Sequence, residues 1–423
     1  MASQMDIPRL RGDQTIAFLR EGYDFIARRC RDLGSDVFAA RLMLQPVTCL
    51  HGAEAAEMVY GNDRLTRRRG AMPPTVLRLL QDKGSVQQLD GPDHRHRKAM
   101  FVDLLMTDAA EASFIGIFRE EWRLALDDWA ERPSIVLLDE AYLVLTRSVC
   151  RWAGVPLGEG EDVEMAHELS AMIENAGSIG AGVVAALWRR RRTERAMARL
   201  VSDIRTGRAA IPGDAPVSVI ANHRDRNGER LPVEVAAVEV INILRPVAAV
   251  ARYVMFSAMA LHEHPAASAA LTGAGSGGYE AFAEEVRRLY PFFPLIGAKA
   301  IGPFEWKGIP FEDGDWLLLD LHGTNHDPRH FPAPGTFDPS RAISWRQQGG
   351  GFVPQGVGDA RRGHRCPGER LTVAVIAEAT RLMVEEMEAR VAPQDLTMPP
   401  GRMPAKPKSG LILTDIARRD GSA

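Results

Sequence analysis

Cys366 lies near the end of a glycine-rich segment, GFVPQGVGDARRGHRCPGE, which spans residues 351–369. From Glu369 onward, apolar residues recur at helical spacing, so the cysteine comes just before the N-terminus of a predicted helix. This position favours a thiolate, because the helix dipole and nearby backbone N–H groups stabilise negative charge. A single thiolate of this kind is typical of the axial ligand of a heme iron, where it favours cleavage of an O–O bond. The plain alternative is a buried free cysteine in a loop.

Arg245 and Pro246 form a second unusual group, at the centre of the apolar stretch Leu231–Glu263. At about thirty residues, this stretch predicts a helix that crosses the molecule. Its charged residues exclude a membrane span. A proline inside a helix costs roughly 3 kcal/mol, and an arginine on an apolar face is unfavourable unless it is paired. Two such features side by side indicate a site, although a structural ion pair is the alternative for Arg245.

His94 and Lys98 lie four residues apart in a predicted helix that begins near Pro92, after a loop over Gly84–Gly91. Residues at this spacing share one helix face. A cation pair there suits an anion such as a heme propionate. His96 is two residues from His94 and points elsewhere, which makes a two-histidine metal site a poor interpretation. Ordinary surface basic residues are the alternative.

Glu285 and Arg288, three residues apart in EEVRRLYPFFP, can pair on one helical turn. The pair alone is a weak signal, because charged residues at this spacing are common. Its position before LYPFFP and upstream of the Cys366 segment makes it specific. In the same segment, Phe292 and Phe293 are candidates either for lining a substrate channel or for packing in the core.

Taken together, the loop F-x-x-x-G…G-H-R-C-P-G, the E-x-x-R pair and the Arg-Pro helix resemble the cytochromes P-450. The cysteine lies further from Phe352 than in most members, and the PQG and GHRC segments resemble those of the bacterial fatty-acid peroxygenases. The resemblance covers nearly the whole chain. It implies a mainly α fold with a small β-rich portion, as a single domain over residues 1–423. Heme b would lie between the long distal helix and the helix after Cys366.

The resemblance also implies roles for individual residues. Cys366 matches the axial ligand of the heme iron, and His94 and Lys98 match residues that bind a heme propionate. His364, beside the cysteine, belongs to the same cofactor-binding set. Arg341, in FDPSR, matches the arginine that completes a buried triad with the E-x-x-R pair, and this triad is expected to brace the cysteine loop.

The resemblance also implies how the residues at the centre of the long helix take part in the reaction. Oxygen-activating members carry an acid–alcohol pair there that relays protons, whereas Val240–Ala251 contains no Asp, Glu, Ser or Thr. Arg245 and Pro246 stand in its place, as in the peroxygenases, so Arg245 would bind the carboxylate of a fatty acid in a bidentate fork. That carboxylate would serve as general acid–base for hydrogen peroxide. The expected products are α- or β-hydroxy acids, with a terminal alkene from decarboxylation as a minor product.

Gln87 matches the residue on the distal side of the heme, where a glutamine is typical of the hydroxylases and a histidine of the alkene-forming decarboxylase. The segment LLQDKGS just before it departs from the family's spacing. The apolar residue expected to touch the substrate is therefore Leu80, or its place is taken by Gln81. Positional selectivity depends on which of the two occupies that place.

The composition fits an ordinary globular protein, with 423 residues, 45% of them hydrophobic, and a formal net charge of −3. No nucleic-acid partner is expected. The four cysteines form no CxxC pair, which argues against a zinc or disulfide protein and fits a reducing cytoplasm. The polar N-terminus predicts neither a signal peptide nor a membrane anchor. The resemblance adds that no redox partner is required.

The remaining segments predict the scaffold. Helices are expected over Thr15–Leu33, Ala109–Trp129, Ser134–Trp152 and 161–206, strands over Val37–Tyr60, Gly297–Leu321 and 411–414, and loops over Ala209–Pro216 and Thr272–Gly278. The run WRRRR, residues 188–192, predicts either a solvated basic face with counter-charges nearby or a docking patch, and the solvated face is the simpler interpretation.

Two other functions stay open. A heme-thiolate monooxygenase would turn over only with NAD(P)H and a reductase, and the missing acid–alcohol pair counts against it. A non-enzymatic heme-thiolate sensor or carrier would bind a fatty acid without turnover by peroxide.

Overall fold

The computed structural model describes residues 7–68, 70–81, 84–178, 180–341, 343–347, 349 and 351–419. In these ranges the α-helices are α1 Thr15–Glu21, α2 Phe25–Leu33, α3 Ala53–Gly61, α4 Pro74–Leu80, α5 Gly91–Leu105, α6 Asp108–Ala130, α7 Leu137–Ala153, α8 Glu161–Glu174, α9 Ala181–Arg205, α10 Pro216–Asn222, α11 Val233–Ala249, α12 Ala251–Glu263, α13 Pro265–Ala269, α14 Ser276–Leu289 and α15 Glu369–Glu385. Single 3-10 turns lie at Gly22–Asp24, Val86–Gln88 and Thr324–His326.

The strands are β1 Val37–Leu42, β2 Gln45–Leu50, β3 Leu65–Thr66, β4 Ser134–Val136, β5 Leu295–Ala300, β6 Phe304–Trp306, β7 Ile309–Phe311, β8 Trp316–Asp320, β9 Met387–Val391 and β10 Ile412–Arg418. The largest sheet has the order β1-β2-β8-β5-β3, in which β2 and β8 are parallel and the other neighbours antiparallel. A three-stranded sheet has the order β4-β10-β9.

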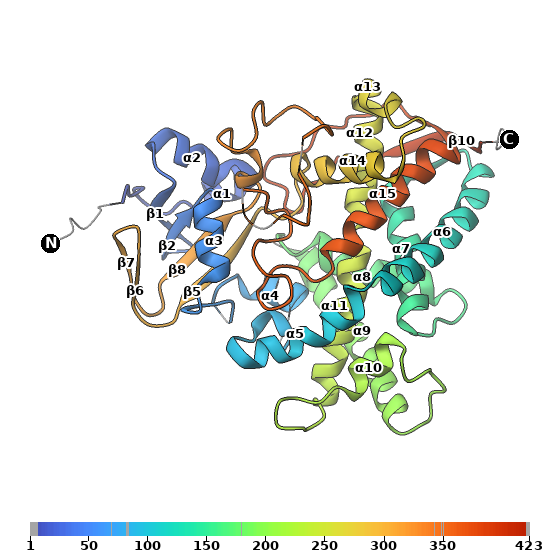
Figure 1. Ribbon diagram of the computed structural model, residues 1–423, viewed down its shortest axis with the longest axis horizontal. Helices are drawn as coiled ribbons and strands as arrows, with labels where there is room; N and C mark the ends of the chain where they lie inside the picture. The colour runs from blue at the N-terminus through green and yellow to red at the C-terminus, as the bar shows by residue number, and fades with distance from the viewer. Residues whose placement is uncertain are drawn as a thin grey trace.

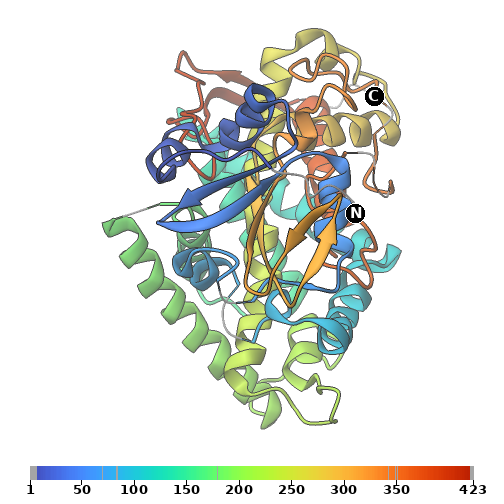
Figure 2. The same cartoon turned by 90° about the vertical axis from the view of Figure 1, so that its left-hand side faces the viewer.

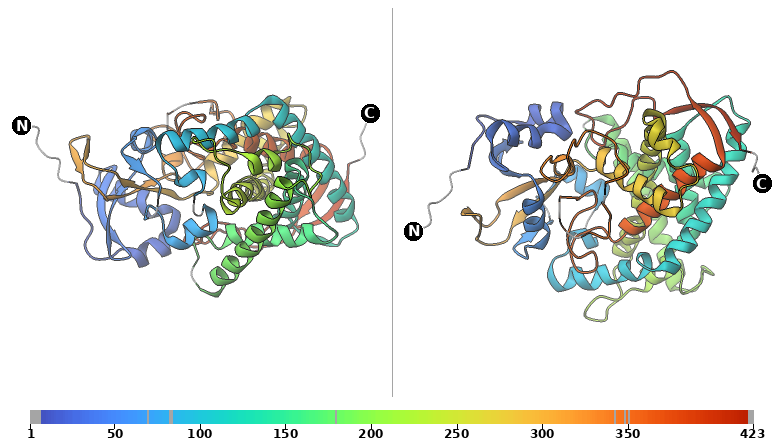
Figure 3. Two further views of the ribbon diagram at one scale, coloured as in Figure 1. Left: turned by 90° about the horizontal axis from the view of Figure 1, so that it is seen from below. Right: turned by 45° about the horizontal axis from the view of Figure 1, so that its top comes forward.

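The largest sheet lies at one end of the molecule together with α1, α2 and α3, and most of the longer helices lie toward the other end (Figure 1). Figure 2 shows the strands in front of the helices, with the long helix α9 at the outer edge. The two views of Figure 3 keep the same division, with blue and orange strands at one end and the teal α6 at the other. This architecture confirms the predicted mainly α fold with a small β-rich portion.

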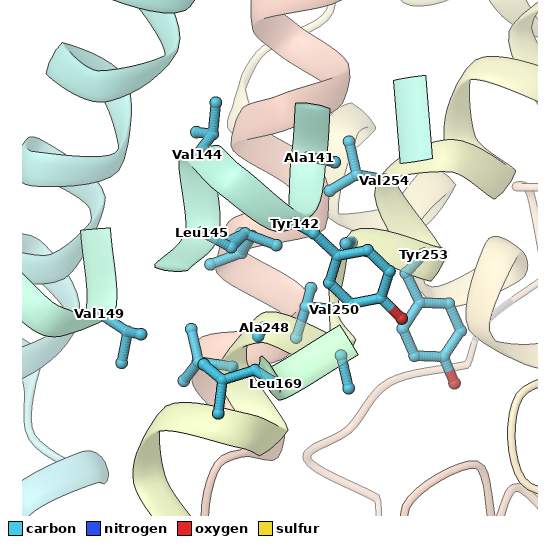
Figure 4. Packing of buried hydrophobic residues seen from close by; sticks show 14 of the residues in the cluster. Ala141, Tyr142, Val144, Leu145, Val149, Leu169, Ala248, Val250, Tyr253 and Val254 are labelled. Atoms are coloured by element: carbon cyan, nitrogen blue, oxygen red, sulfur yellow. The ribbon is translucent and has the colours of Figure 1, made fainter. Parts of the chain in front are cut away.

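The helices α11 and α12 form the centre of the helical part. Every residue from Ala236 to Ala260 is buried except Pro246. The apolar residues of α7 recur every three or four positions, so α7 presents one continuous face to this centre. Figure 4 shows Tyr142 and Leu145 of α7 beside Ala248 and Val250. The site residues of α11 are therefore held in a fully packed core.

Three predicted elements are divided or replaced. The helix expected over Thr15–Leu33 is interrupted at Gly22, whose φ is +53° and where a Cβ atom would meet the carbonyl oxygen of Pro400 at 2.1 Å. The strands expected over Val37–Tyr60 end at Leu50; the prediction is wrong for α3, where a run of alanine and glutamate favours a helix. The segment 161–206 forms two helices, α8 and α9.

The long helix predicted over Leu231–Glu263 is nearly continuous. It changes from α11 to α12 at Val250, whose N–H donates to the carbonyl of Val247 three residues back. This tightened turn follows Pro246 by one helical turn. Smaller differences are that residues 134–136 form β4, that α14 already begins at Ser276, and that the last strand is 412–418. Within the described ranges, no helix is both long and apolar enough to cross a membrane.

Candidate active site

Cys366 occupies the predicted position directly before α15. Its N–H donates to the carbonyl of Gln355 at 3.1 Å, and its own carbonyl accepts from Glu369 N–H at 3.4 Å. The cysteines Cys30, Cys49 and Cys150 are buried, whereas Cys366 is partly exposed, and all four are free thiols. Burial raises the pKa of Cys366, opposed by the charge of Lys98 and by hydrogen bonds from Gly368 and Gln355. The last three groups are those that stabilise a metal-bound thiolate.

The structure brings Glu285, Arg288 and Arg341 together. Arg288 Nη2 lies 2.6 Å from Glu285 Oε1, and Arg341 Nε lies 3.4 Å from the same oxygen. Arg288 also donates to the carbonyls of Asn325 and Pro334, at 3.2 and 2.8 Å. The pair on α14 is thus tied to the loop that leads into the cysteine segment.

A second buried ion-pair chain, which the sequence motifs above do not include, reaches the cysteine loop itself. Arg287 pairs with both Glu284 and Glu369. Arg365 Nε lies 2.6 Å from Glu369 Oε2, and Arg365 Nη1 donates to the carbonyl of Gln347 at 2.9 Å. The signal was present, because EEVRR contains the E-x-x-R spacing in two overlapping registers. This chain fixes the residue adjacent to Cys366.

His94, Lys98 and His364 also come together. The rings of His94 and His364 lie 4.0 Å apart between centroids. Lys98 Nζ donates to the carbonyl of Gly363 at 3.0 Å and to that of Arg365. These contacts join α5 to the cysteine loop on the side that the resemblance assigned to the heme propionates.

Arg67 belongs to this basic cluster and was not foreseen. Its guanidinium lies over the ring of Tyr60, and its buried Nη2 has no hydrogen-bond partner among the described residues. Burial and then the charges of Lys98 and Arg67 lower the pKa of His94 to about 4, and burial also lowers that of Lys98 to about 8.

None of His94, Lys98, His364 or Arg67 has a carboxylate partner in the part of the chain described. Four buried or half-buried basic groups therefore lack an anion. A dicarboxylate such as heme, with its two propionates, supplies the charge that this cluster needs. The residues present fit this cofactor: Cys366 would provide the thiolate for its iron, and the basic cluster would face its carboxylates.

Arg245 is buried on α11 and forms no ion pair with any described residue. Its Nη2 lies 3.3 Å from Asn242 Oδ1 and its Nη1 lies 3.5 Å from the carbonyl oxygen of Leu79, and no carboxylate of the described residues pairs with it. Burial, and then the charge of Arg190, lowers its pKa well below its usual range. The structural ion pair considered for Arg245 is therefore wrong within the described ranges. Pro246, next to it, is exposed, whereas the residues around it from Ala236 to Ala249 are buried.

Gln87 is linked to Arg245 through Asn242. Asn242 Nδ2 donates to Gln87 Oε1 at 3.2 Å and to Glu239 Oε2 at 2.8 Å. Glu239 Oε1 in turn accepts from Arg97 Nη1 at 2.8 Å. Because Glu239 holds the Asn242 amide by its nitrogen, the amide oxygen faces the guanidinium. Glu239 and Arg97 were missed; a charged residue one turn before Asn242 in an apolar helix was the available signal.

The remaining substrate-site candidates lie in different surroundings. Leu80 ends α4 and is half-buried, and the adjacent Gln81 has a buried Oε1 atom without a hydrogen-bond partner in the described ranges. Phe292 stacks on Tyr253 with centroids 4.4 Å apart, so it packs against α12. Phe293 is 46% exposed and touches Phe292 edge-on. The structure thus gives Phe292 a packing role and leaves Phe293 accessible.

Known proteins share both the motifs and the fold. The sequence pattern described as cytochrome P-450 matches residues 279–409. Cytochrome P-450 4A11 of Homo sapiens is 30% identical over 132 residues, which is 31% of this chain and 25% of that protein. The match therefore spans about a quarter of the length of this relative.

Solved structures are similar over nearly the whole chain. Cytochrome P-450EX alpha (CYP152N1) with myristic acid is 39% identical at a TM-score of 0.93, covering 98% of this chain and 100% of that one. Cytochrome P-450SP alpha (CYP152B1) with (R)-ibuprophen is 41% identical at a TM-score of 0.92, covering 96% and 99%. A variant of cytochrome P-450 OleT with arachidonic acid is 28% identical at a TM-score of 0.94, covering 99% and 100%. The chain belongs to the cytochrome P-450 family, in the fatty-acid peroxygenase branch of the CYP152 proteins.

Proposed function

We propose that this protein is a heme-thiolate peroxygenase that uses hydrogen peroxide to hydroxylate long-chain fatty acids at the α or β carbon. One observation carries the proposal: Arg245 is buried and has no carboxylate partner among the described residues, beside the exposed Pro246, in the helix expected over the heme. A buried guanidinium needs an anion, and a fatty acid brings one. The whole chain, residues 1–423, would act as one heme-thiolate domain.

Heme, when bound at Cys366, would supply the iron at which the O–O bond of peroxide is cleaved. Arg245 would bind the substrate carboxylate in a bidentate fork and hold it beside that bond. No Asp, Glu, Ser or Thr lies between Val240 and Ala251 to move a proton there. The bound carboxylate would therefore take the proton from one oxygen of peroxide and return it to the other, as general acid–base. Its fixed position makes this a proximity effect.

Gln87 and Leu80 would set the position of attack. Gln87 is held by Asn242, so its amide would stay fixed on the distal side of the cofactor. A neutral glutamine cannot deliver a proton as a histidine can, which favours hydroxylation over decarboxylation. Leu80 and the accessible Phe293 would contact the alkyl chain, whereas Phe292 packs on Tyr253 behind Phe293.

The ligands named in the related structures support an acid substrate. Myristic acid, arachidonic acid and (R)-ibuprophen are all carboxylic acids, and each is bound by a protein whose fold this chain shares. A reductase would then be unnecessary. Hydrogen peroxide supplies the oxygen atom and is already two electrons more reduced than O2, so no electrons have to be delivered before its O–O bond is cleaved.

The test is direct. Heme-loaded protein is mixed with myristic acid and hydrogen peroxide, without reductase or nicotinamide, and the products are analysed by mass spectrometry. Hydroxylated myristic acid is expected, and its fragmentation gives the position of attack. Absence of product despite a thiolate-type heme spectrum, with product appearing only when NAD(P)H and a reductase are added, would replace the peroxygenase with a monooxygenase. Tight acid binding without product under either condition would indicate a carrier.

A further inference from the structure

The outward side of α9 carries a stripe of exposed apolar and basic side chains. The members of this stripe follow one another at spacings of three or four residues, so they lie on one helix face. They are Val184, Trp188, Arg191, Arg195 and Arg199. Val184 is 68% exposed and Trp188 is 61% exposed. Because α9 lies at the outer edge of the molecule (Figure 2), the stripe is turned away from the core.

The opposite face of α9 holds the helix in place. Its buried residues recur at the same spacing and are Val183, Ala186, Arg190, Thr193, Met197 and Val201. Arg190 donates to Glu194 Oε1 at 2.9 Å and to the carbonyl of Leu79 at 2.8 Å. Arg192 pairs with Glu164, and with Glu168 at 3.1 Å. The run of residues 188–192 is therefore divided: Arg190 is structural and Arg192 has the counter-charges that the simpler interpretation predicted.

Four of the other arginines of α9 lack such counter-charges among the described residues. The helix contains seven arginines and two acidic residues, in a chain whose formal net charge is −3. No carboxylate in the described part of the chain pairs with Arg189, Arg191, Arg195 or Arg199. Unpaired positive charges so close together repel one another. Binding of an external polyanion would therefore stabilise this surface.

We propose that this stripe docks the protein on the surface of an anionic lipid bilayer. Arginine binds lipid phosphate through two parallel hydrogen bonds, and a tryptophan ring is suited to the boundary between headgroups and acyl chains. Val184 adds an aliphatic side chain one turn from Trp188. A polyanion without an apolar layer would use the arginines and leave Val184 in water. The combination is that of a helix lying in the plane of a membrane interface.

The docked surface would lie one helix away from the fatty-acid site. α9 packs against α11, which carries Arg245. Arg190 on the inner face of α9 and Arg245 on α11 both reach the carbonyl oxygen of Leu79, at 2.8 and 3.5 Å. Fatty acids partition into bilayers, so docking would bring the protein to its substrate. That benefit rests on the proposed function, whereas the binding itself does not.

The experiment is flotation of the heme-loaded full chain with vesicles of phosphatidylglycerol and, separately, of phosphatidylcholine. Floated protein is expected with phosphatidylglycerol only, and raising the salt concentration should release it. The variant Arg191→Glu/Arg195→Glu/Arg199→Glu should bind phosphatidylglycerol vesicles about 100-fold more weakly, because each charge near the surface contributes to binding. The reduced carbonyl spectrum confirms that each variant is folded.

A matched control reverses three arginines on another exposed surface, as Arg11→Glu/Arg28→Glu/Arg31→Glu, whose net charge change is the same. The affinity of this control for vesicles should stay within about threefold of the wild-type affinity. That small loss is the general effect of the changed net charge. Equal losses in the two triple variants would overturn the proposal, since net charge alone would then explain binding. Binding that is insensitive to salt, or absent from phosphatidylglycerol, would overturn it as well.

The depth of Trp188 is the second measurement. Lipids brominated near the headgroup should quench the tryptophan fluorescence of the wild-type protein more than that of Trp188→Phe. Equal quenching of the two proteins would contradict insertion of Trp188, and binding to heparin that exceeds binding to vesicles would assign the stripe to a soluble polyanion. Peroxide-driven turnover of dissolved myristic acid is measured in parallel and should be unchanged in the triple variant. Loss of turnover in the wild-type protein would disprove the proposed function and leave vesicle binding standing.

Discussion

Arg245 Nη2 lies 3.3 Å from Asn242 Oδ1, and this neutral amide stands where a buried guanidinium would ordinarily have a carboxylate. The same amide donates to Gln87 Oε1 and to Glu239 Oε2. One side chain therefore connects the proposed anchor of the substrate, the residue proposed to lie over the cofactor and a buried carboxylate. The guanidinium is oriented by Asn242 and its charge is left for a ligand.

Replacing Arg245 with alanine should abolish peroxide-driven turnover of myristic acid while heme still binds. The substrate carboxylate loses its anchor and the proton transfer loses its fixed geometry, so we expect a rate at least about 100-fold lower. Arg245→Lys keeps the charge without the planar fork and should recover only part of the rate. Turnover is measured by product mass spectrometry, and heme loading by the thiolate spectrum. Full activity in Arg245→Ala would refute the mechanism.

Glu239→Gln should weaken fatty-acid binding without changing the axial ligand. The glutamine amide can present its nitrogen to Asn242, which reverses the Asn242 amide and turns a donor toward Arg245. We expect the dissociation constant of myristic acid to rise about tenfold, the equivalent of about 1.4 kcal/mol. It is read from the substrate-induced shift of the Soret band.

A control with imidazole separates a change in the orientation of the Asn242 amide from a general loss of folding around the heme. Imidazole binds iron without using Arg245, so its affinity should stay constant in Glu239→Gln. The variant also leaves Arg97 buried without its partner, and the double variant Glu239→Gln/Arg97→Met should restore stability without restoring fatty-acid affinity. An equal loss for imidazole and myristic acid would show that the pocket has collapsed.

Most of the candidate site could be proposed from the sequence because its signals are local. Each signal depends on a few neighbouring residues. The signals are the spacing of Glu285 and Arg288, the glycine-rich loop around Cys366, and the unfavourable free energy of an arginine and a proline side by side in an apolar helix. The structure then placed His94 and Lys98 beside the loop of His364, although Lys98 and His364 lie 266 positions apart in the chain. No local pattern predicts such a contact, and only the resemblance brought these residues together.

The residues that were missed act over long distances in the chain. Arg67 faces His94 and His364 from a segment with no helical or strand pattern, so nothing in its own neighbourhood marks it. Gly22 interrupts a helix because Pro400, nearly four hundred residues away in the chain, approaches its backbone. The incorrect strand prediction over residues 53–60 has a different cause. The apolar residues there alternate in part as in a strand, but the alanine-rich composition favours the helix α3 that the structure shows.

Cys366→Ala should remove the thiolate character of the heme. The Soret band of the reduced carbonyl complex should shift to the position of a non-thiolate heme, and turnover should cease. Cys150→Ala is the matched control, because Cys150 is buried and burial raises its pKa to about 12, so it cannot serve as a thiolate ligand. A normal thiolate spectrum in Cys366→Ala would mean that another residue binds the iron.

His94 should make the stability of the heme-free protein depend on pH. Burial, and then Lys98 and Arg67, lowers its pKa to about 4 in the folded protein. The unfolded chain has a histidine pKa of about 6.5, so between these values the unfolded chain binds more protons. Stability therefore falls as the pH is lowered through this window. His94→Gln should remove part of that fall in urea unfolding experiments.

Heme binding should change how His94 affects the pH dependence of stability, and it should leave the corresponding effect of His223 unchanged. Propionates beside His94 favour its charged form, so heme loading should reduce the difference between wild type and His94→Gln. The pKa of His223 is also lowered to about 4, by burial and by Arg97, and its ring lies beside His96 on the other side of α5. His223→Gln should show the same pH effect with and without heme. An identical response to heme at both positions would place the propionates elsewhere.

Gln87→His should increase the share of terminal alkene among the products. Gln87 Oε1 accepts a hydrogen bond from Asn242, which holds the amide on the side of Arg245, and an amide cannot exchange a proton near neutral pH. A histidine at this position titrates in that range and can assist loss of the carboxyl group. Alkene and hydroxy acid are quantified from one reaction with myristic acid and peroxide. Gln87→Asn, which shortens the amide and cannot titrate, is the control and should lower the total rate without raising the alkene share. An unchanged product ratio in Gln87→His would show that the outcome is set by the alkyl-chain contacts near Leu80 instead.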